Sequence, residues 1–192
     1  TKLTSEWLNE FGGLNGLRVS DVEEAIGPIG DLYRHPHLED GEISGVFLGQ
    51  FFPWNGSANA QLAMEHGFKV WERQDVEGSV GAYENLDNLQ TGIHDYFKYL
   101  KFGLGRATDL LSNHIRRGKI SREDAIEVAK ARDGMFPYNY LGMPLHKILR
   151  PIGVTAEDFL YVCDNFTNWD LFTGSHVREG EVKPKFILGG GQ

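Results

Sequence analysis

A three-residue link, Gly103-Leu104-Gly105, divides the most strongly patterned part of the sequence into two segments. Apolar residues recur at helical spacing on both sides of this link, as in helices that each bury one face. They are Ile93, Tyr96, Phe97 and Leu100 before the link, and Ala107, Leu110, Leu111, His114 and Ile115 after it. Because glycine interrupts helices, we predict a sharp turn between two helices, the second of which ends at Gly118.

Three further helices are predicted downstream of this pair. They cover Ser121 to about Asp133, Leu145 to Leu149, and Thr155 to Phe166. The first of them begins with a sequence similar to a capping box. We therefore expect a mainly helical portion over residues 91–172. The polar, glycine-rich tail over residues 173–192 is expected to form a hairpin or to be disordered.

The first 90 residues have a different pattern, with many glycines and two candidate strands. Residues 43–52 form an apolar run that predicts a buried strand ending at an Asn-Gly turn, and residues 69–77 predict a second extended segment. A helix is predicted between them over residues 58–66. This order predicts an α/β portion with a loop-rich N-terminus over residues 1–90, so the expected fold class is α/β to α+β.

Composition excludes several classes of protein. The chain has 192 residues, of which 41% are hydrophobic, as is ordinary for a globular protein. It contains no apolar run near the roughly 20 residues of a membrane span and no secretory signal, so we expect a cytoplasmic protein without membrane contact. The single Cys163 cannot form an internal disulfide or, alone, a cysteine-based zinc site, and no metal site is predicted.

The charge of the chain is acidic overall but locally reversed. The formal net charge is −8, which argues against nucleic acid as a partner. Between His94 and Arg122, however, there are seven basic residues and only two acidic ones. A basic region on an acidic protein indicates a site for an anionic ligand.

Polar residues in this basic region line up along the two predicted helices. They are His94, Lys98 and Lys101 on the first helix, and Arg106, Asp109 and Asn113 on the second. A glycine turn that leads into a helix N-terminus offers backbone N–H groups and a favourable dipole to an anion. The pattern predicts a phosphate or pyrophosphate cradle or, alternatively, a solvated helix face with internal Lys–Asp pairs.

Two other segments have both a functional and a structural interpretation. The loop over residues 83–88 contains Glu84, Asn85 and Asp87, whose side chains could hold Mg²⁺ or a sugar, or could simply form a turn. The aromatic run over residues 51–54 could stack on a base or sugar, or pack in the core.

Four stretches of the sequence together resemble one family. They are Gly-Val-Phe-Leu-Gly-Gln-Phe-Phe-Pro-Trp-Asn-Gly (45–56), Tyr-Glu-Asn-Leu-Asp-Asn (83–88), Gly-Ile-His-Asp-Tyr-Phe-Lys-Tyr-Leu-Lys-Phe-Gly-Leu-Gly-Arg-Ala-Thr-Asp (92–109), and Ile-Arg-Arg-Gly-Lys-Ile-Ser-Arg-Glu-Asp-Ala (115–125). Over residues 42–172 the chain resembles the C-terminal half of the N-acetyl sugar amidotransferases of lipopolysaccharide and pseudaminic acid biosynthesis, which belong to the PP-loop ATP pyrophosphatase group.

The resemblance implies a reaction that converts a sugar acetamido group into an acetamidino group. ATP, with Mg²⁺, would activate the amide oxygen as an adenylate, and ammonia from a partner glutaminase subunit would attack the carbon. A nucleotide-activated N-acetyl sugar is the implied substrate, and self-association of the chain is left open. Because some PP-loop enzymes modify tRNA, the basic region could also contact RNA, although the net charge of −8 argues against this.

The sequence departs from the family in its nucleotide-binding element. The family's Ser-Gly-Gly-x-Asp-Ser loop is absent, because Ser44-Gly45 is not followed by a second glycine, and the cysteine pair near the family's N-terminus is absent too. We therefore expect a C-terminal half that is inactive alone. The alternative is a non-catalytic module that binds a sugar nucleotide or assembles with a partner.

By resemblance, six residues fall in the family's strongest motif, and their chemistry suggests a role for each. Lys98, Lys101 and Arg106 would hold phosphates. The assigned catalytic residues are Asp95 and Asp109, which would orient those cations or take a proton from ammonia, and His94, which could also take that proton. Arginine suits a bidentate phosphate contact better than lysine does. Weaker candidates for substrate binding are Glu84 and Asn85.

Overall fold

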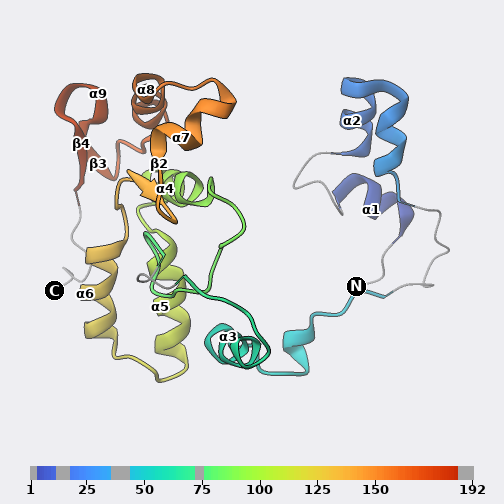
Figure 1. The fold of residues 1–192 in the computed structure, drawn as a ribbon, viewed down its shortest axis with the longest axis horizontal. Coiled ribbons are helices and arrows are strands. Elements are labelled where there is room, and N and C mark those ends of the chain that lie inside the picture. Colours follow the sequence, from blue (N-terminus) through green and yellow to red (C-terminus); the bar gives the residue numbers. More distant parts are fainter. Residues whose placement is uncertain (1–3, 12–17, 36–43, 72–75, 186–192) are drawn as a thin grey trace. The chain divides into compact units, whose positions relative to one another are not determined.

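The computed structural model describes residues 4–11, 18–35, 44–71 and 76–185 (Figure 1). The chain divides into two compact units, Thr1–Ser57 and Ala58–Gln192. We describe each unit by itself, because their relative positions are not determined.

The described residues of the first unit include two short α-helices and two 3₁₀ helices. They are α1 (Ser5–Phe11), α2 (Val19–Ile26), η1 (Gly27–Tyr33) and η2 (Leu48–Gln50). At the start of α2 the backbone N–H of Arg18 donates to the Asp21 carboxylate at 2.9 Å. This contact satisfies one hydrogen-bonding group at the helix entry, as a capping residue does.

Both predicted strands in the N-terminal portion are wrong for the residues that the structure describes. Residues 44–52 contain the one-turn helix η2, and residues 69–71 and 76–77 lie outside any strand. The described part of the first unit offers the apolar run no sheet to pair with, and a strand without a partner leaves its backbone groups unpaired. Phe51 and Phe52 are accordingly exposed.

The second unit is mainly helical, as predicted. Its helices are α4 (Thr91–Phe102), α5 (Arg106–Arg116), α6 (Arg122–Arg132), α7 (Leu145–Leu149), the 3₁₀ helix η3 (Arg150–Ile152), α8 (Ala156–Phe166) and α9 (His176–Glu179). Helix α3 (Gly56–Glu65) spans the boundary with the first unit and confirms the helix predicted near residues 58–66. None of the described helices is both long and apolar enough to span a membrane.

Side-chain caps set the starts of two of these helices. Ser121 accepts a hydrogen bond from the backbone N–H of Asp124 at 3.0 Å before α6, which confirms the predicted capping pattern. Before α8, Thr155 accepts from the N–H of Asp158 at 3.0 Å, and the Asp158 carboxylate accepts from the N–H of Thr155 at 3.2 Å. Each cap replaces a hydrogen bond that the first turn of a helix lacks.

Two small antiparallel sheets complete the second unit. Strands β1 (Asn139–Tyr140) and β2 (Met143–Pro144) form one, and β3 (Phe172–Ser175) and β4 (Glu181–Pro184) form the other. The second sheet brings Phe172 opposite Pro184 and Ser175 opposite Glu181, with α9 between the strands. The hairpin alternative is therefore confirmed for residues 173–184, and the fold is α+β in the described residues.

The core of the second unit lies between α4, α7 and α8. Its fully buried residues include Leu100 on α4, Leu149 on α7, and Phe159 and Cys163 on α8. Burial raises the pKa of the Cys163 thiol to about 12, so Cys163 is an apolar core residue rather than a reactive thiol. A second cluster of small residues packs α5 against α6, which lie side by side in Figure 1.

Candidate functional site

The Gly103-Leu104-Gly105 link makes the sharp turn that the sequence predicts and brings one face of α4 beside one face of α5. Gly103 ends α4 in the left-handed conformation, with φ of 74°, which glycine adopts without strain. A Cβ atom at Gly105 would lie 2.5 Å from a carboxylate oxygen of Asp133. Both glycines are therefore required by the geometry of this elbow.

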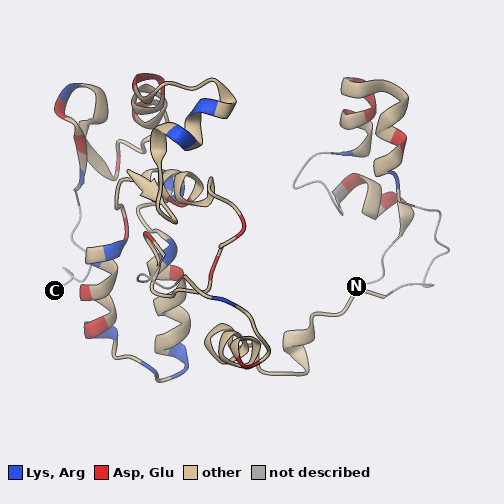
Figure 2. Ribbon diagram, in the orientation of Figure 1, with Lys and Arg blue, Asp and Glu red and all other residues tan. Residues whose placement is uncertain are grey.

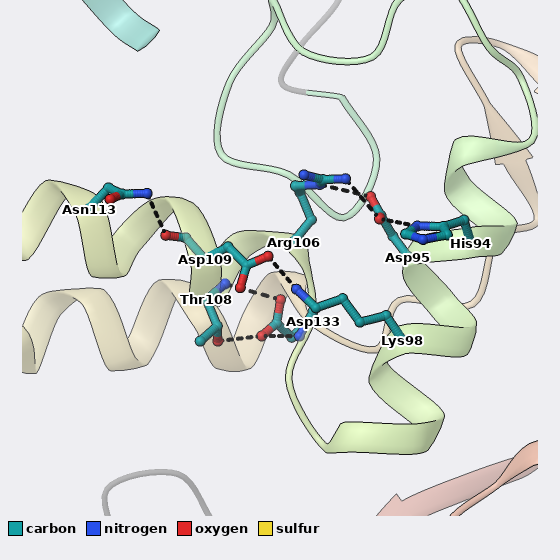
Figure 3. Close-up of polar contacts among 9 residues, drawn as sticks. His94, Asp95, Lys98, Arg106, Thr108, Asp109, Asn113 and Asp133 are labelled. Atoms are coloured by element: carbon teal, nitrogen blue, oxygen red, sulfur yellow. Dashed lines mark hydrogen bonds and ion pairs between the residues drawn. The ribbon is translucent and has the colours of Figure 1, made fainter. Parts of the chain in front are cut away.

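Across the elbow, Arg106 forms a bidentate ion pair with Asp95 (Figure 3). The guanidinium Nε and Nη2 atoms each lie 3.1 Å from an Asp95 carboxylate oxygen, and His94 Nδ1 lies 3.0 Å from Oδ1 of the same carboxylate. Burial alone would lower the pKa of Arg106, but its hydrogen bonds and nearby carboxylates raise it overall. Arg106 therefore stays charged and is held in one orientation.

A second ion pair joins the same two helices one turn away. Lys98 Nζ donates to the Asp109 carboxylate, and Asn113 donates to the backbone carbonyl of Asp109 at 3.2 Å. In Figure 2, basic and acidic segments accordingly alternate along α5. The internal Lys–Asp pairing that the sequence left as an alternative is present. We call the set His94, Asp95, Lys98, Arg106 and Asp109 the elbow cluster.

The N-terminus of α5 is closed by a carboxylate from the end of α6. Asp133 accepts hydrogen bonds from the N–H of Gly105 at 2.9 Å, the N–H of Thr108 at 3.4 Å and the hydroxyl of Thr108 at 2.5 Å (Figure 3). These two N–H groups are not available to a phosphate, so the predicted backbone cradle is wrong at these positions. The sequence signal for Asp133 was only that of a helix end.

Glu84 and Asn85 approach the elbow cluster in different ways. Burial raises the pKa of Glu84, Asp95 and Asp109 raise it further, and Arg106 opposes them, so Glu84 lies within electrostatic range of the cluster. Asn85 has a positive φ of 53°, and its carbonyl accepts from the Tyr140 hydroxyl at 3.3 Å. Glu84 thus interacts with the elbow cluster through the charge of its side chain, whereas Asn85 contacts Tyr140 through its backbone carbonyl.

The predicted site residue Lys101 lies apart from these ion pairs. Its Nζ atom lies 4.7 Å from the centre of the Phe166 ring, and it has no carboxylate partner among the residues that the structure describes. Lys101 borders a groove of about 490 Å³ between α4 and α8, together with His94, Phe97, Lys98, Phe102, Val162 and Phe166. We call this the α4–α8 groove.

A separate cavity of about 120 Å³ lies beside the Asp95–Arg106 pair. Gly92, Asp133 and Tyr140 also line it. A Cβ atom at Gly92 would lie 2.6 Å from the Tyr140 ring, so this glycine allows the ring to pack against α4.

The carboxylates of the elbow cluster do not suit a Mg²⁺ ion. Asp95 and Asp109 are both engaged by cationic side chains, and Mg²⁺ requires free oxygen ligands in a regular octahedron. In the described part of the chain no three His, Cys, Asp or Glu side chains converge on a metal-sized site.

A buried polar network on another face of α4, around Tyr96, was not predicted from the sequence. His176 Nε2 lies 2.7 Å from the Tyr96 hydroxyl, and His176 Nδ1 lies 2.6 Å from Asp164 Oδ1. Asp164 also accepts from the Ser175 hydroxyl at 2.5 Å and from the N–H of His176 at 2.7 Å. The residues are up to 80 positions apart, and His176 lies in the segment that the sequence presented as a tail, so no local pattern connects them.

Comparison with known protein families connects the chain to proteins of LPS biosynthesis. The model for the family described as "LPS biosynthesis protein WbpG-like, C-terminal domain" matches residues 77–182, which is more than half of the chain and includes the whole elbow cluster. No curated protein matches the chain. The resemblance to proteins of lipopolysaccharide biosynthesis is thereby confirmed, and the chain belongs to the WbpG-like family of LPS biosynthesis proteins through its C-terminal domain.

Proposed function

We propose that this chain is the C-terminal part of an ATP-dependent N-acetyl sugar amidotransferase. It would act with a glutaminase subunit that supplies ammonia, and it would convert a sugar acetamido group into an acetamidino group. The observation that supports this most is that the family match contains the elbow cluster, in which residues of one sequence motif, His94 to Asp109, converge in space.

The cluster has the properties that this reaction requires of a protein. An amide oxygen is a poor leaving group, and ATP supplies the adenylyl group that makes it leave. Negative charge then develops on phosphate oxygens, and fixed cations stabilise it without reorganisation. Arg106 is held by Asp95 and Lys98 by Asp109, so both cations are oriented in advance.

His94 is the side chain best placed to accept a proton. It is the most exposed member of the cluster, and its Nδ1 atom contacts Asp95. When ammonia adds to the amide carbon, the adduct must lose a proton, and a histidine imidazole is a common acceptor for such a proton. In this proposal Asp95 orients both His94 and Arg106.

A non-catalytic module that binds a sugar nucleotide is the second candidate. It is favoured by the α4–α8 groove, which combines aromatic side chains with Lys101, a cation without a carboxylate partner in the described part of the chain. The missing Ser-Gly-Gly-x-Asp-Ser loop means that another polypeptide segment would hold ATP under the first proposal.

The test is amidination by the complete enzyme with its glutaminase. We expect Arg106→Ala to lower kcat/KM at least about 100-fold, which corresponds to about 2.7 kcal/mol of transition-state stabilisation. Arg122→Ala is the matched control, because Arg122 is exposed at the first turn of α6, and it should stay within about threefold of the parent. If Arg106→Ala folds normally and also stays within about threefold, the catalytic proposal is wrong.

A further inference from the structure

We propose that the α4–α8 groove binds the nucleoside phosphate portion of the substrate, with Lys101 on the phosphate and the Phe102 ring against the base. This inference rests on the proposed function for the choice of an activated sugar. The groove itself is defined by its residues, its size and its charge, whatever reaction follows.

The three cations nearest the elbow, Lys98, Lys101 and Arg106, are not equivalent. Lys98 and Arg106 already donate to a carboxylate, whereas Lys101 has no carboxylate partner among the described residues. An ammonium held over an aromatic ring still has N–H donors that can bind another partner. Lys101 is therefore the cation of this region that is best prepared to receive a phosphate.

The rest of the groove is apolar and aromatic. Phe97 forms edge contacts with Phe159 and Phe166, both at centroid distances of 5.8 Å, so the floor is fixed by packing. Phe102 is 64% exposed. An exposed ring beside Lys101 matches a ligand that combines a planar base with a phosphate, and base stacking on such a ring contributes roughly 1–3 kcal/mol.

Size and position favour a small ligand over a protein segment. A volume of about 490 Å³ lies within the range of small-molecule sites. His94 and Lys98 border the groove and also belong to the elbow cluster, so a sugar attached to the phosphate would extend toward Asp95. The N-terminus of α5, the other candidate phosphate site, already holds the Asp133 carboxylate.

Binding can be measured on this chain without any catalysis. We would titrate it with UDP, ADP, uridine and ribose 5-phosphate by calorimetry and follow backbone amides by NMR. We expect both nucleotides to bind more tightly than either fragment, with the largest shifts on α4 and α8. Lys101→Gln should weaken nucleotide binding at least about tenfold, or about 1.4 kcal/mol. Phe102→Leu should abolish the advantage of the nucleotides over ribose 5-phosphate.

Lys130→Gln is the matched control, because Lys130 is a surface lysine on α6 that pairs with Glu127, and it should leave binding unchanged. The proposal is overturned if no nucleotide binds at about 10 mM, or if Lys101→Gln and Lys130→Gln bind equally well. It is also overturned if Phe102→Leu prevents association with the glutaminase while nucleotide binding persists, because the groove would then be a protein interface. Full amidination by the Lys101→Gln enzyme would refute this inference but not the proposed function.

Discussion

Two neighbouring residues of α4, Asp95 and Tyr96, anchor two polar networks of opposite character. Asp95 joins the elbow cluster, where His94 keeps 72% of its side chain exposed. Tyr96 joins Asp164 and His176, and the His176 side chain is 0% exposed. Helix α4 thus takes part in two networks with different roles, because its neighbouring side chains point in different directions. Charges that must meet a ligand stay near solvent, while the polar groups around Tyr96 are enclosed and fully paired.

The largest test of this contrast replaces one histidine from each network. His176→Ala should lower the free energy of unfolding by about 3 kcal/mol or more, because it leaves the buried Tyr96 hydroxyl without its partner and removes the imidazole contact of Asp164. His94→Ala should change it by no more than about 0.5 kcal/mol, as is usual for surface positions. Urea denaturation of both variants measures the two changes in unfolding free energy. Equal changes would contradict the distinction between a buried structural network and an exposed one.

A smaller effect on the unfolding free energy is expected from pH, and it concerns the buried network of Tyr96, Asp164 and His176. Burial alone would raise the pKa of Asp164, but hydrogen bonds from Ser175 and His176 lower it overall in the folded chain. An acid with a depressed folded pKa stabilises the fold fully above its unfolded value of about 3.9, and this stabilisation is lost as the pH falls through the folded pKa.

Asp164→Asn removes this titration and is the natural comparison. The difference in unfolding free energy between parent and variant should be constant from neutral pH down to about pH 5 and should shrink at lower pH. Urea titrations at several pH values measure it. A difference that grows on acidification would mean that Asp164 is not the stabilising carboxylate.

The smallest effect is expected at the Lys98–Asp109 pair. Their side chains are 22% and 44% exposed, so solvent screens their attraction. A double-mutant cycle with Lys98→Ala and Asp109→Ala should give a coupling below about 1 kcal/mol that decreases with added salt. A coupling free energy as large as the loss of stability in His176→Ala would mean that the elbow cluster stabilises the fold as strongly as the buried network does. The elbow cluster would then have a structural role, and the argument that it binds a ligand would fail.

Local signals were enough to predict much of the second unit. The boundaries of α4, α5, α6 and α8 follow from apolar periodicity, two side-chain caps and the elbow glycines, all of which act within a few residues. The convergence of Asp95, Lys98, Arg106 and Asp109 follows from helical spacing on both sides of a short turn. Such features need no knowledge of the remaining chain.

The failures all involve partners that are distant in the sequence. The apolar run at residues 43–52 has strand composition, but composition cannot supply the neighbouring strand that a sheet requires. Asp133 reaches Gly105 across 28 residues, and His176 reaches Tyr96 across 80. These contacts depend on how helices pack, which a single sequence does not encode in any short window.

Because Cys163 is buried between α4 and α8, its reaction with a thiol reagent can report the separation of these two helices. It is the sole thiol of the chain, it is 0% exposed between α4 and α8, and its pKa is raised to about 12. A thiol reagent at neutral pH meets almost no thiolate while the core is closed. The rate at which the reagent modifies Cys163 therefore reports how often α8 separates from α4. The same opening disrupts the packed side chains that form the base of the α4–α8 groove.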